Sequence, residues 1–490
     1  MGLRDSYRDR MNTKKRNITI AITVAMFLGA VEGTVVTTAV PTIVKELSGF
    51  ELISWVFSIY LLTSAVSIPI CGKLCDLYGR KSILTIGIVI FLVGSTLCGL
   101  SASMYELVAF RALQGIGAGA IFTVTFTIVG DVFELEERAK VQGWMSSTWG
   151  IASLAGPFVG GFLIDNLSWH WIFFINIPFG VLSIILLQRN LKEGCVKERH
   201  RIDIAGAVLL SAAIISLLYG FLLFGKNDLA MLACLLVSAG ILAVFYIVEK
   251  RTGEPIVPFD VFTRTSTIVN IISFLASAVL IAINVYMPLY LQNVLGSSAM
   301  VSGLTMAPMS VTWMLASVYV GKAIPRFGEK AVIAVSSLVV AASCLLLPTL
   351  SLNSPLFLVI IYTSVMGFGF GAGFTTLTIV VQMSVDYNKR GAATALNSLV
   401  RTLGQTIGIS IFGSIFNLGI AEYLTGIGIK GIDAGNLYSS PSINDAAYLE
   451  QVRLSQVSGL HIIYAVVIVV SLASLILTFV LPKNQSAKPE

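Results

Sequence analysis

Charged side chains are scarce in this chain. Asp, Glu, Lys and Arg together make up 12 % of its 490 residues, about half of what soluble domains carry. Hydrophobic residues make up 56 %, and the mean hydropathy is +0.87. The core of a water-soluble protein cannot accommodate that composition. The sequence therefore predicts an integral membrane protein that crosses the bilayer many times.

Residues that bind metals or catalyse reactions are also few. The six cysteines lack the paired spacing of a metal site and are expected to be free thiols. No GxxxxGK[ST] loop, which would cradle the phosphates of ATP, occurs in the chain, so we expect neither metal nor cofactor. A membrane-embedded transferase would need catalytic side chains grouped together, and His170, His200 and His461 have no such neighbours. We therefore do not expect an enzyme, and a transferase is only a remote alternative.

Fourteen apolar runs are long enough to cross a membrane as helices. A hydrocarbon core of about 30 Å needs roughly 20 apolar residues, and such runs start near residues 18, 52, 82, 106, 142, 171, 204, 229, 267, 301, 331, 356, 393 and 459. With the N-terminus inside, 26 Lys and Arg residues fall in cytoplasmic segments and 4 fall outside. Because cytoplasmic loops are enriched in these residues, we predict cytoplasmic termini in a bacterial-type plasma membrane. The net charge of +6 is spread over many short loops, which indicates no nucleic-acid partner.

One loop sequence occurs twice. GKLCDLYGRK (72–81) recurs in register as GKAIPRFGEK (321–330), 249 residues later. The repeat predicts two six-helix bundles with two extra helices between them, in which rocking of the halves alternates access to a central substrate site. The expected parts are a cytoplasmic segment (1–17), an N-terminal bundle (18–190), a linker with the two extra helices (191–250), a C-terminal bundle (251–482) with an extracellular loop (418–458), and a cytoplasmic tail (483–490). We expect the extracellular loop to be partly ordered at most.

Glu32 is the only acidic residue within the fourteen runs. A carboxylate at membrane depth is costly, and it usually faces the protein interior and carries ions or protons. At about 1.5 Å per residue, Glu32 and Arg111 lie ~12 Å and ~9 Å from the outer ends of their runs. These similar depths predict a proton-coupling pair, because Arg favours the ionised carboxylate while burial favours the protonated one. The alternative is a static ion pair that only holds two helices together.

Several motifs resemble those of one transporter family. The loop GKLCDLYGRKSIL resembles the loop signature of the major facilitator superfamily, and LVAFRALQGIGAG in the fourth run resembles its second motif. The fifth run resembles the antiporter signature, with Gly143, Gly156, Pro157 and Gly160 in place and Ala152 where glycine is usual. The resemblance implies the major facilitator fold, an all-α membrane architecture.

Two further segments resemble the fourteen-span drug/proton antiporter branch. VEGTVVTTAVP (31–41) resembles its first-span motif, and WHWIFFINIP (169–178) resembles the entry of its sixth span. The usual acid of the first motif is Asp, and here it is Glu32; the usual residue between the two Trp is Arg, and here it is His170. The resemblance implies a multidrug efflux transporter driven by the proton gradient.

The resemblance also implies a conformational gate. In this family the loop acid, here Asp76, and an acid at the end of span four, here Asp131, are thought to hold the two halves closed on the cytoplasmic side. Asp76 would reach a helix N-terminus, whose partial positive charge attracts it. The same motif contributes Gly72, Gly79 and Arg80. The second copy has proline at the position of the acid, so only the first loop can form this latch.

A substrate cavity is implied in the same way. Polar and aromatic residues on the spans that line it in the family are Trp149, Asn284, Tyr290, Gln292, Trp313, Tyr362 and Gln405. Arg401 lies ~12 Å into its run and either snorkels to the cytoplasmic surface or lines this cavity.

The expected function is export by alternating access in exchange for protons. The expected partners are amphipathic small molecules, cationic or neutral and lipophilic, together with protons and the lipid bilayer, and the expected state is a monomer. Because the shared motifs describe the transport machine and not its cargo, a dedicated exporter of one metabolite, lipid or siderophore is the alternative.

Overall fold

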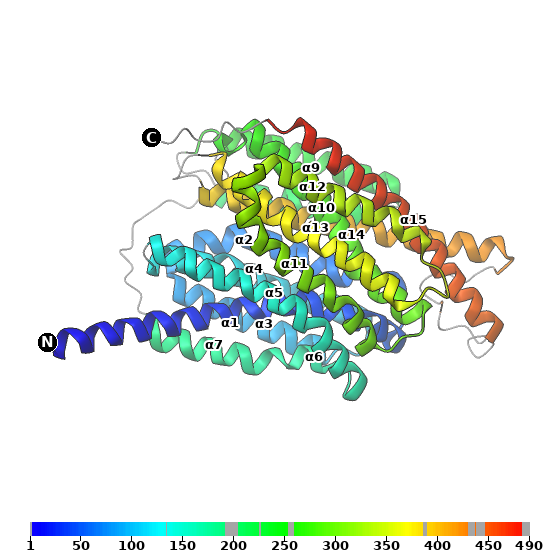
Figure 1. Cartoon of the computed structure of the whole chain (residues 1–490), viewed down its shortest axis with the longest axis horizontal. Helices are drawn as coiled ribbons and strands as arrows, with labels where there is room; N and C mark the ends of the chain where they lie inside the picture. The colour runs from blue at the N-terminus through cyan, green and yellow to red at the C-terminus, as the bar shows by residue number, and fades with distance from the viewer. Residues whose placement is uncertain are drawn as a thin grey trace. The chain divides into compact units, whose positions relative to one another are not determined.

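The structure is a computed structural model, shown in Figure 1. It describes residues 2–133, 135–191, 204–224, 227–252, 259–385, 390–429, 437 and 446–482. Within these ranges the regular structure is helical, with no strand. This agrees with the all-α membrane fold predicted from the sequence.

The helices follow the predicted runs closely. Those of the N-terminal half are α1 (Gly2–Leu47), η1 (Phe50–Leu52), α2 (Ile53–Tyr78), α3 (Arg80–Gly99), α4 (Met104–Val132), α5 (Leu135–Asn166), α6 (Trp171–Phe174) and α7 (Asn176–Asn190). The two between the halves are α8 (Ile204–Leu222) and α9 (Asp228–Glu249). Those of the C-terminal half are η2 (Phe259–Val261), α10 (Arg264–Leu289), η3 (Tyr290–Val294), α11 (Ala299–Phe327), α12 (Glu329–Leu346), η4 (Leu347–Thr349), α13 (Leu356–Met383), α14 (Arg390–Gly426) and α15 (Ala446–Val480).

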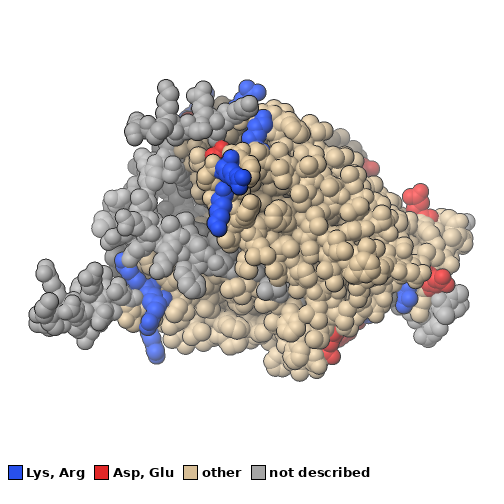
Figure 2. All heavy atoms as spheres, viewed as in Figure 1, with Lys and Arg blue, Asp and Glu red and all other residues tan. Residues whose placement is uncertain are grey.

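The lengths and surfaces of these helices suit a bilayer. Twelve helical segments among the described residues are long and apolar enough to cross a membrane, and α8 holds a shorter apolar stretch, Val208–Phe221. One of the twelve joins α6 and α7, and together with α5 and α8 the count agrees with the fourteen expected spans. Most of the described surface on the face in Figure 2 is uncharged. Large apolar side chains such as Leu229 and Val318 are exposed, as lipid-facing residues would be.

The chain divides into two compact units. The first holds Met1–Ala39, Ile59–Ile215 and Ala239–Ile256; the second holds Val40–Ser58, Ser216–Ser238 and Val257–Glu490. In the first unit α3 packs along α4 and α7, and in the second α13 packs along α11 and α12. The parts expected from the sequence are continuous stretches of the chain, whereas each compact unit combines three stretches. The expected division into parts stays a prediction.

The repeated loop places a glycine at the same turn in both halves. Gly79, before α3, has φ +91°, and Gly328, before α12, has φ +79°. Each NH donates to the carbonyl four residues earlier, at 3.0 and 2.8 Å. A positive φ is strained for residues with a side chain, which explains the glycine in both copies.

The last lysine of the repeat also has the same contact in both halves. Lys81 Nζ donates to the carbonyl of Gln188 at the end of α7, at 2.9 Å. Lys330 Nζ donates to the carbonyls of Phe479, at 2.8 Å, and Leu481 at the end of α15. A cation at a helix C-terminus meets carbonyls that have no partner within the helix. The lysines therefore tie the third helix of each half to its last helix.

The loop expected at 418–458 is largely helical where it is described. Helix α14 continues to Gly426, and α15 already begins at Ala446. The two ends stabilise one another, since Tyr423 donates to Gln451 at 3.1 Å. The loop therefore starts later and ends earlier than predicted, because polar residues end an apolar run without ending the helix; residues 430–436 and 438–445 lie outside the described part of the chain, and the degree of order of the loop stays a prediction.

The first helix is also longer than its apolar run. α1 continues beyond Val40, through Pro41, to Leu47. Charged Lys45 and Glu46 break the apolar pattern, but Ile43 and Val44 remain buried. Glu32 consequently lies 15 residues from the helix end, or ~22 Å, so the expected distance of ~12 Å from Glu32 to the end of its helix was wrong.

Candidate functional site

The first unit encloses the carboxylate of Glu32 completely. Its side chain on α1 is 1 % exposed. Oε1 forms an ion pair with Nη1 of Arg111 on α4, and Oε2 accepts a hydrogen bond from Nδ2 of Asn176 on α7, at 2.9 Å. The structure thus brings together the acid and the base that the sequence singled out. Their role in proton coupling stays a prediction.

Arg111 is held from two further directions. Its Nη1 also donates to Oε1 of Gln114, one turn along α4, at 2.8 Å. Its Cζ lies 4.1 Å from the ring centroid of Tyr60 on α2, which is the geometry of a cation–π contact. The guanidinium is 1 % exposed, so carboxylate, amide and aromatic ring together replace water around it.

A polar chain continues from Asn176. Its Nδ2 also lies 3.0 Å from Oγ of Ser95 on α3, and Ser95 Oγ donates to the carbonyl of Phe173 at 2.8 Å. All three side chains from Glu32 to Ser95 are buried. Sequence reasoning missed Asn176, Ser95 and Tyr60. The available signal was that Asn176 is a neutral polar residue within the apolar run of the quoted WHWIFFINIP segment.

Glycines allow the helices around Arg111 to approach one another. A Cβ on Gly115 would lie 2.4 Å from the carbonyl oxygen of Tyr60, so α4 meets α2 here through a missing side chain. A Cβ on Gly94 of α3 would lie 2.6 Å from the backbone nitrogen of Gln114. The second motif of the sequence therefore combines a charge with the close packing that buries it.

The antiporter motif packs against the helix that carries Glu32. On α5, a Cβ at Gly156 would lie 2.0 Å from Oγ1 of Thr34, and one at Gly160 would lie 3.0 Å from Val35. Thr34 Oγ1 also lies 3.1 Å from the carbonyl of Ala152, to which it donates. Both glycines thus face α1 within the turns that follow Glu32. Gly143 and Pro157 lie on the same helix α5.

The proposed gate is described only in part. Gly79 forms the turn before α3, and Arg80 Nη1 donates to the carbonyl of Cys75 at 3.3 Å. Gly72 and Asp76 belong to α2 and Asp131 to α4, but the side chains of both acids lie outside the described part. The cytoplasmic latch stays a prediction.

Seven of the eight expected cavity residues lie in the second unit, where they fall into separate environments. Trp313 on α11 stacks on Phe374 of α13, with ring centroids 5.5 Å apart, and Cζ of Arg401 lies 4.1 Å from the centroid of the same Phe374 ring. Tyr290 OH donates to the carbonyl of Ser351 at 2.6 Å, as an aromatic anchor at a helix end would.

The other members of the expected set are spread along the helices. Gln292 accepts a hydrogen bond of 3.4 Å from Thr42, and the hydroxyl of Tyr362 lies 3.0 Å from Oγ1 of Thr349. Asn284 and Gln405 are partly exposed on α10 and α14. The side chain of Trp149 lies outside the described part.

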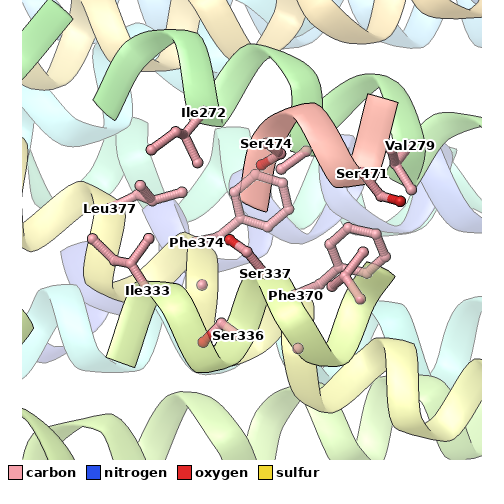
Figure 3. Close-up of a pocket in the computed structure, with 14 residues that line it drawn as sticks. Ile272, Val279, Ile333, Ser336, Ser337, Phe370, Phe374, Leu377, Ser471 and Ser474 are labelled. Atoms are coloured by element: carbon pink, nitrogen blue, oxygen red, sulfur yellow. The ribbon is translucent and has the colours of Figure 1, made fainter. Parts of the chain in front are cut away.

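Two cavities are lined by described residues of the second unit. One of about 30 Å³ lies between α10, α12, α13 and α15, and Figure 3 shows Phe370 and Phe374 among its lining residues. A second of about 270 Å³ is lined by Phe262, Thr267, Asn270, Ile271, Phe274 and Val400. Drug-sized ligands occupy pockets of roughly 300–1,000 Å³, so the smaller cavity cannot hold one.

Comparison with known proteins places these features in a family. The family description "Major Facilitator Superfamily" matches residues 22–409, which covers most of the chain. The chain belongs to the major facilitator superfamily. This family consists of membrane transporters, so the chain is a transporter and not an enzyme.

Relatives in the superfamily include drug transporters. The chain is 35 % identical over 424 residues to the multidrug transporter protein MdtP of Bacillus subtilis (strain 168), covering 85 % of this chain and 78 % of that protein. It is 33 % identical over 403 residues to multidrug resistance protein 3 of the same organism, covering 81 % and 79 %. The multidrug efflux pump SdrM of Staphylococcus aureus (strain N315) is 28 % identical over 411 residues, covering 83 % and 91 %.

Solved structures of other members share the fold at low identity. A bacterial homolog of the human lysosomal transporter Spinster, in an inward-facing and occupied conformation, has a TM-score of 0.66 at 16 % identity, covering 95 % of this chain and 96 % of its own. A D-xylose-proton symporter has a TM-score of 0.64 at 15 % identity, covering 96 % and 99 %. At these identities the likeness establishes the major facilitator fold alone.

Proposed function

We propose that this transporter is a proton-coupled antiporter that exports amphipathic compounds, cationic or neutral and lipophilic, from the cytoplasm by alternating access. Its multidrug relatives support the cargo class. The observation that carries the proposal is the buried Glu32, the one acid of the predicted spans, enclosed by Arg111 and Asn176. Intramembrane acids mark ion and proton pathways.

The proposed cycle uses one carboxylate for two ligands. In the state open to the cytoplasm, ionised Glu32 favours a cationic drug. In the state open to the outside, a proton from that side neutralises Glu32, and the drug leaves. Arg111 tunes the exchange because a helix movement that changes its distance from Glu32 alters how strongly the charged form is favoured.

The rest of the proposal concerns driving force and setting. The proton gradient supplies the energy, with no cofactor and no metal. The protein is a monomer in the plasma membrane of a bacterial-type cell, with both termini in the cytoplasm. Where its substrates are antibiotics, export confers resistance.

Drug-induced proton release tests the central step. Adding a cationic drug to purified protein in weakly buffered detergent should acidify the medium. The bound cation displaces the proton from those molecules in which Glu32 is protonated. Glu32→Gln should abolish this signal while leaving binding of a neutral lipophilic substrate intact. Glu32→Asp should retain part of it, since the change removes only one methylene.

Glu106→Gln is the matched control. It makes the same change at the start of α4, where Glu106 is exposed and accepts a backbone hydrogen bond at 2.8 Å, a role that Gln can also fill. This variant should release protons like the unaltered protein. Undiminished release from Glu32→Gln would refute the assignment and direct attention to Asp131 and Asp165.

A further inference from the structure

Arg401 lies inside a predicted span. It is the twelfth residue of α14 and the sixth of the apolar segment Leu396–Gly426. Its side chain is partly buried, and its guanidinium stacks on Phe374 of α13, nine residues before the end of that helix at Met383. At about 1.5 Å per residue, this partner lies ~14 Å from the helix end. The stacking contact therefore holds the guanidinium inside the span and not at its end.

No acid neutralises this guanidinium within the described part of the chain. Arg401 there has no ion pair and no hydrogen bond, and its one described interaction is the cation–π contact with Phe374. Arg111, by contrast, is paired with Glu32. A guanidinium offers five N–H donors in a planar fork that fits an oxyanion. An unpaired charge inside a membrane is costly, so an anionic ligand would be favoured here.

An aromatic surface adjoins the charge. Phe374 stacks on Trp313 and on Phe370, with centroids 5.5 and 5.9 Å away and interplanar angles of 24° and 15°. The surface is held by close packing, since a Cβ at Gly371 would lie 2.2 Å from the carbonyl oxygen of Trp313. Figure 3 shows Phe370 and Phe374 projecting from α13 into the small cavity. With only about 30 Å³, that cavity cannot admit a second aromatic ring, so a ligand would lie against the partly exposed Trp313 and Arg401.

We propose that Arg401, Phe374 and Trp313 form a recognition site for the oxyanion of an aromatic acid. The guanidinium binds a carboxylate, sulfonate or phosphate, and the aromatic surface takes the attached ring. The transporter then accepts acidic and zwitterionic aromatic amphiphiles besides cationic and neutral ones. The inference rests on the proposed export function for its biological meaning, but the site itself is independent of Glu32.

Two probes that share a fluorophore distinguish the contribution of the ligand's charge to binding from the contribution of its aromatic ring. Dansylglycine carries a carboxylate and dansylcadaverine carries an amine, and energy transfer from tryptophan reports the binding of either probe. The full-length protein is placed in phosphatidylcholine nanodiscs for titration. Arg401→Gln should weaken dansylglycine about 10- to 100-fold, the equivalent of one or two charge-assisted hydrogen bonds. Dansylcadaverine should change by less than about threefold.

Further variants keep the test decisive. Arg401→Lys retains the charge without the planar fork and should weaken dansylglycine alone, by a smaller factor. Phe374→Leu should weaken both probes. The matched control is Arg326→Gln, because Arg326 is exposed near the end of α11 and its Cζ lies 5.2 Å from the ring centroid of Phe327; it should change neither Kd. Equal loss of both probes in Arg401→Gln and Arg401→Lys, or no loss in either, overturns the proposal.

Two further experiments complete the test. One distinguishes a bound substrate from a bound lipid, and the other shows whether ligand binding at Arg401 depends on the proton-coupling residue Glu32. If a lipid phosphate is the true occupant, Arg401→Gln will release co-purified phosphatidylglycerol without altering dansylglycine binding in phosphatidylcholine, and that result also overturns the proposal. Glu32→Gln should leave the Kd of dansylglycine unchanged even where proton release is lost. Failure of either proposal is therefore visible without failure of the other.

Discussion

At the scale of single residues, the Glu32 carboxylate is satisfied by two different kinds of donor. Arg111 supplies a charge to Oε1, and Asn176 supplies a neutral amide to Oε2. Because each oxygen has its own partner from a different helix, α4 or α7, movement of either helix changes the carboxylate's environment. Asn176 is thus a positioning residue in the proposed exchange, and its contribution can be measured apart from the charge.

Asn176→Ala should uncouple drug binding from proton release, and this effect should be larger than its loss of fold stability alone explains. Loss of a hydrogen bond to a charged group costs about 1.5–3 kcal/mol, against about 0.5–1.5 kcal/mol for a neutral one. The control is Ser183→Ala, which removes a 2.8 Å hydrogen bond from α7 to the Ala21 carbonyl on the same helix α1. Both variants should lower the melting temperature in detergent, and only Asn176→Ala should reduce drug-induced acidification. Equal acidification from the two variants would leave Asn176 a purely structural role.

The charged members of this site were predictable from the sequence, and its neutral members were not. An acid or a base inside an apolar run stands out, so Glu32 and Arg111 could be singled out by residue type and position in the sequence alone. Asn176 and Tyr60 are of types that occur in many spans, and only the three-dimensional packing of helices shows which of them face the carboxylate. The matching of Glu32 with Arg111 was right although the helix end used to estimate its depth was wrong.

At the scale of helices, the antiporter motif is a packing surface. Gly156 and Gly160 bring α5 onto the turns of α1 that follow Glu32, and the two positions differ in how much room they leave. A Cβ at Gly156 would meet Thr34 Oγ1 at 2.0 Å, whereas one at Gly160 would meet its nearest neighbour at 3.0 Å. Of these two contacts between α5 and α1, the tighter one is therefore the one nearer to the proposed proton site.

Gly156→Ala should impair transport more than Gly160→Ala. Overpacking at the tighter contact costs about 1–3 kcal/mol and pushes α1 away from α5. The control is Gly240→Ala on α9, where nothing lies within 4 Å of an added Cβ and the change should stabilise the helix by about 0.5–1 kcal/mol. Initial efflux rates at matched expression, with melting temperatures of the purified variants, check the order. An efflux rate for Gly160→Ala below that of Gly156→Ala would contradict it.

The repeated lysines predict equal effects in the two halves. Lys81→Met and Lys330→Met each remove a charged donor from the carbonyls at the end of the last helix of their half. Each should lower stability by about 1 kcal/mol, because the groups are partly exposed and the full value of a charged hydrogen bond is not reached. Lys322→Met, an exposed lysine of the same repeat without a described hydrogen bond, should have no effect. Thermal unfolding of the three variants in detergent tests this, and a loss confined to one half would disprove the equivalence.

Helix number and order followed from the sequence, whereas helix ends did not. The fourteen apolar runs anticipate the spans because a bilayer fixes the length of an apolar segment. The same rule does not predict how far a helix continues beyond the bilayer. The continuations of α1 to Leu47 and of α14 to Gly426 were therefore missed. There, local packing and hydrogen bonds such as Tyr423 to Gln451 extend the helix.

At the scale of the whole molecule, the direction of transport depends on orientation in the membrane. The proposed exchange needs Glu32 to receive its proton from outside and its drug from the cytoplasm. The count of 26 Lys and Arg residues on one side against 4 on the other predicts that orientation, since basic segments are retained in the cytoplasm.

Single cysteines in a background without the six native ones can test it. Ser48→Cys, between α1 and η1, and Asn227→Cys, before α9, should react in intact cells with a maleimide that cannot cross the membrane. Arg251→Cys, after α9, should react only in everted vesicles, and all three positions are exposed. The pattern is expected because the segment after α9 belongs to the basic side and the other two do not. The reverse pattern would make the same Glu32 site load protons from the cytoplasm, and the proposed exporter would then have to be an importer.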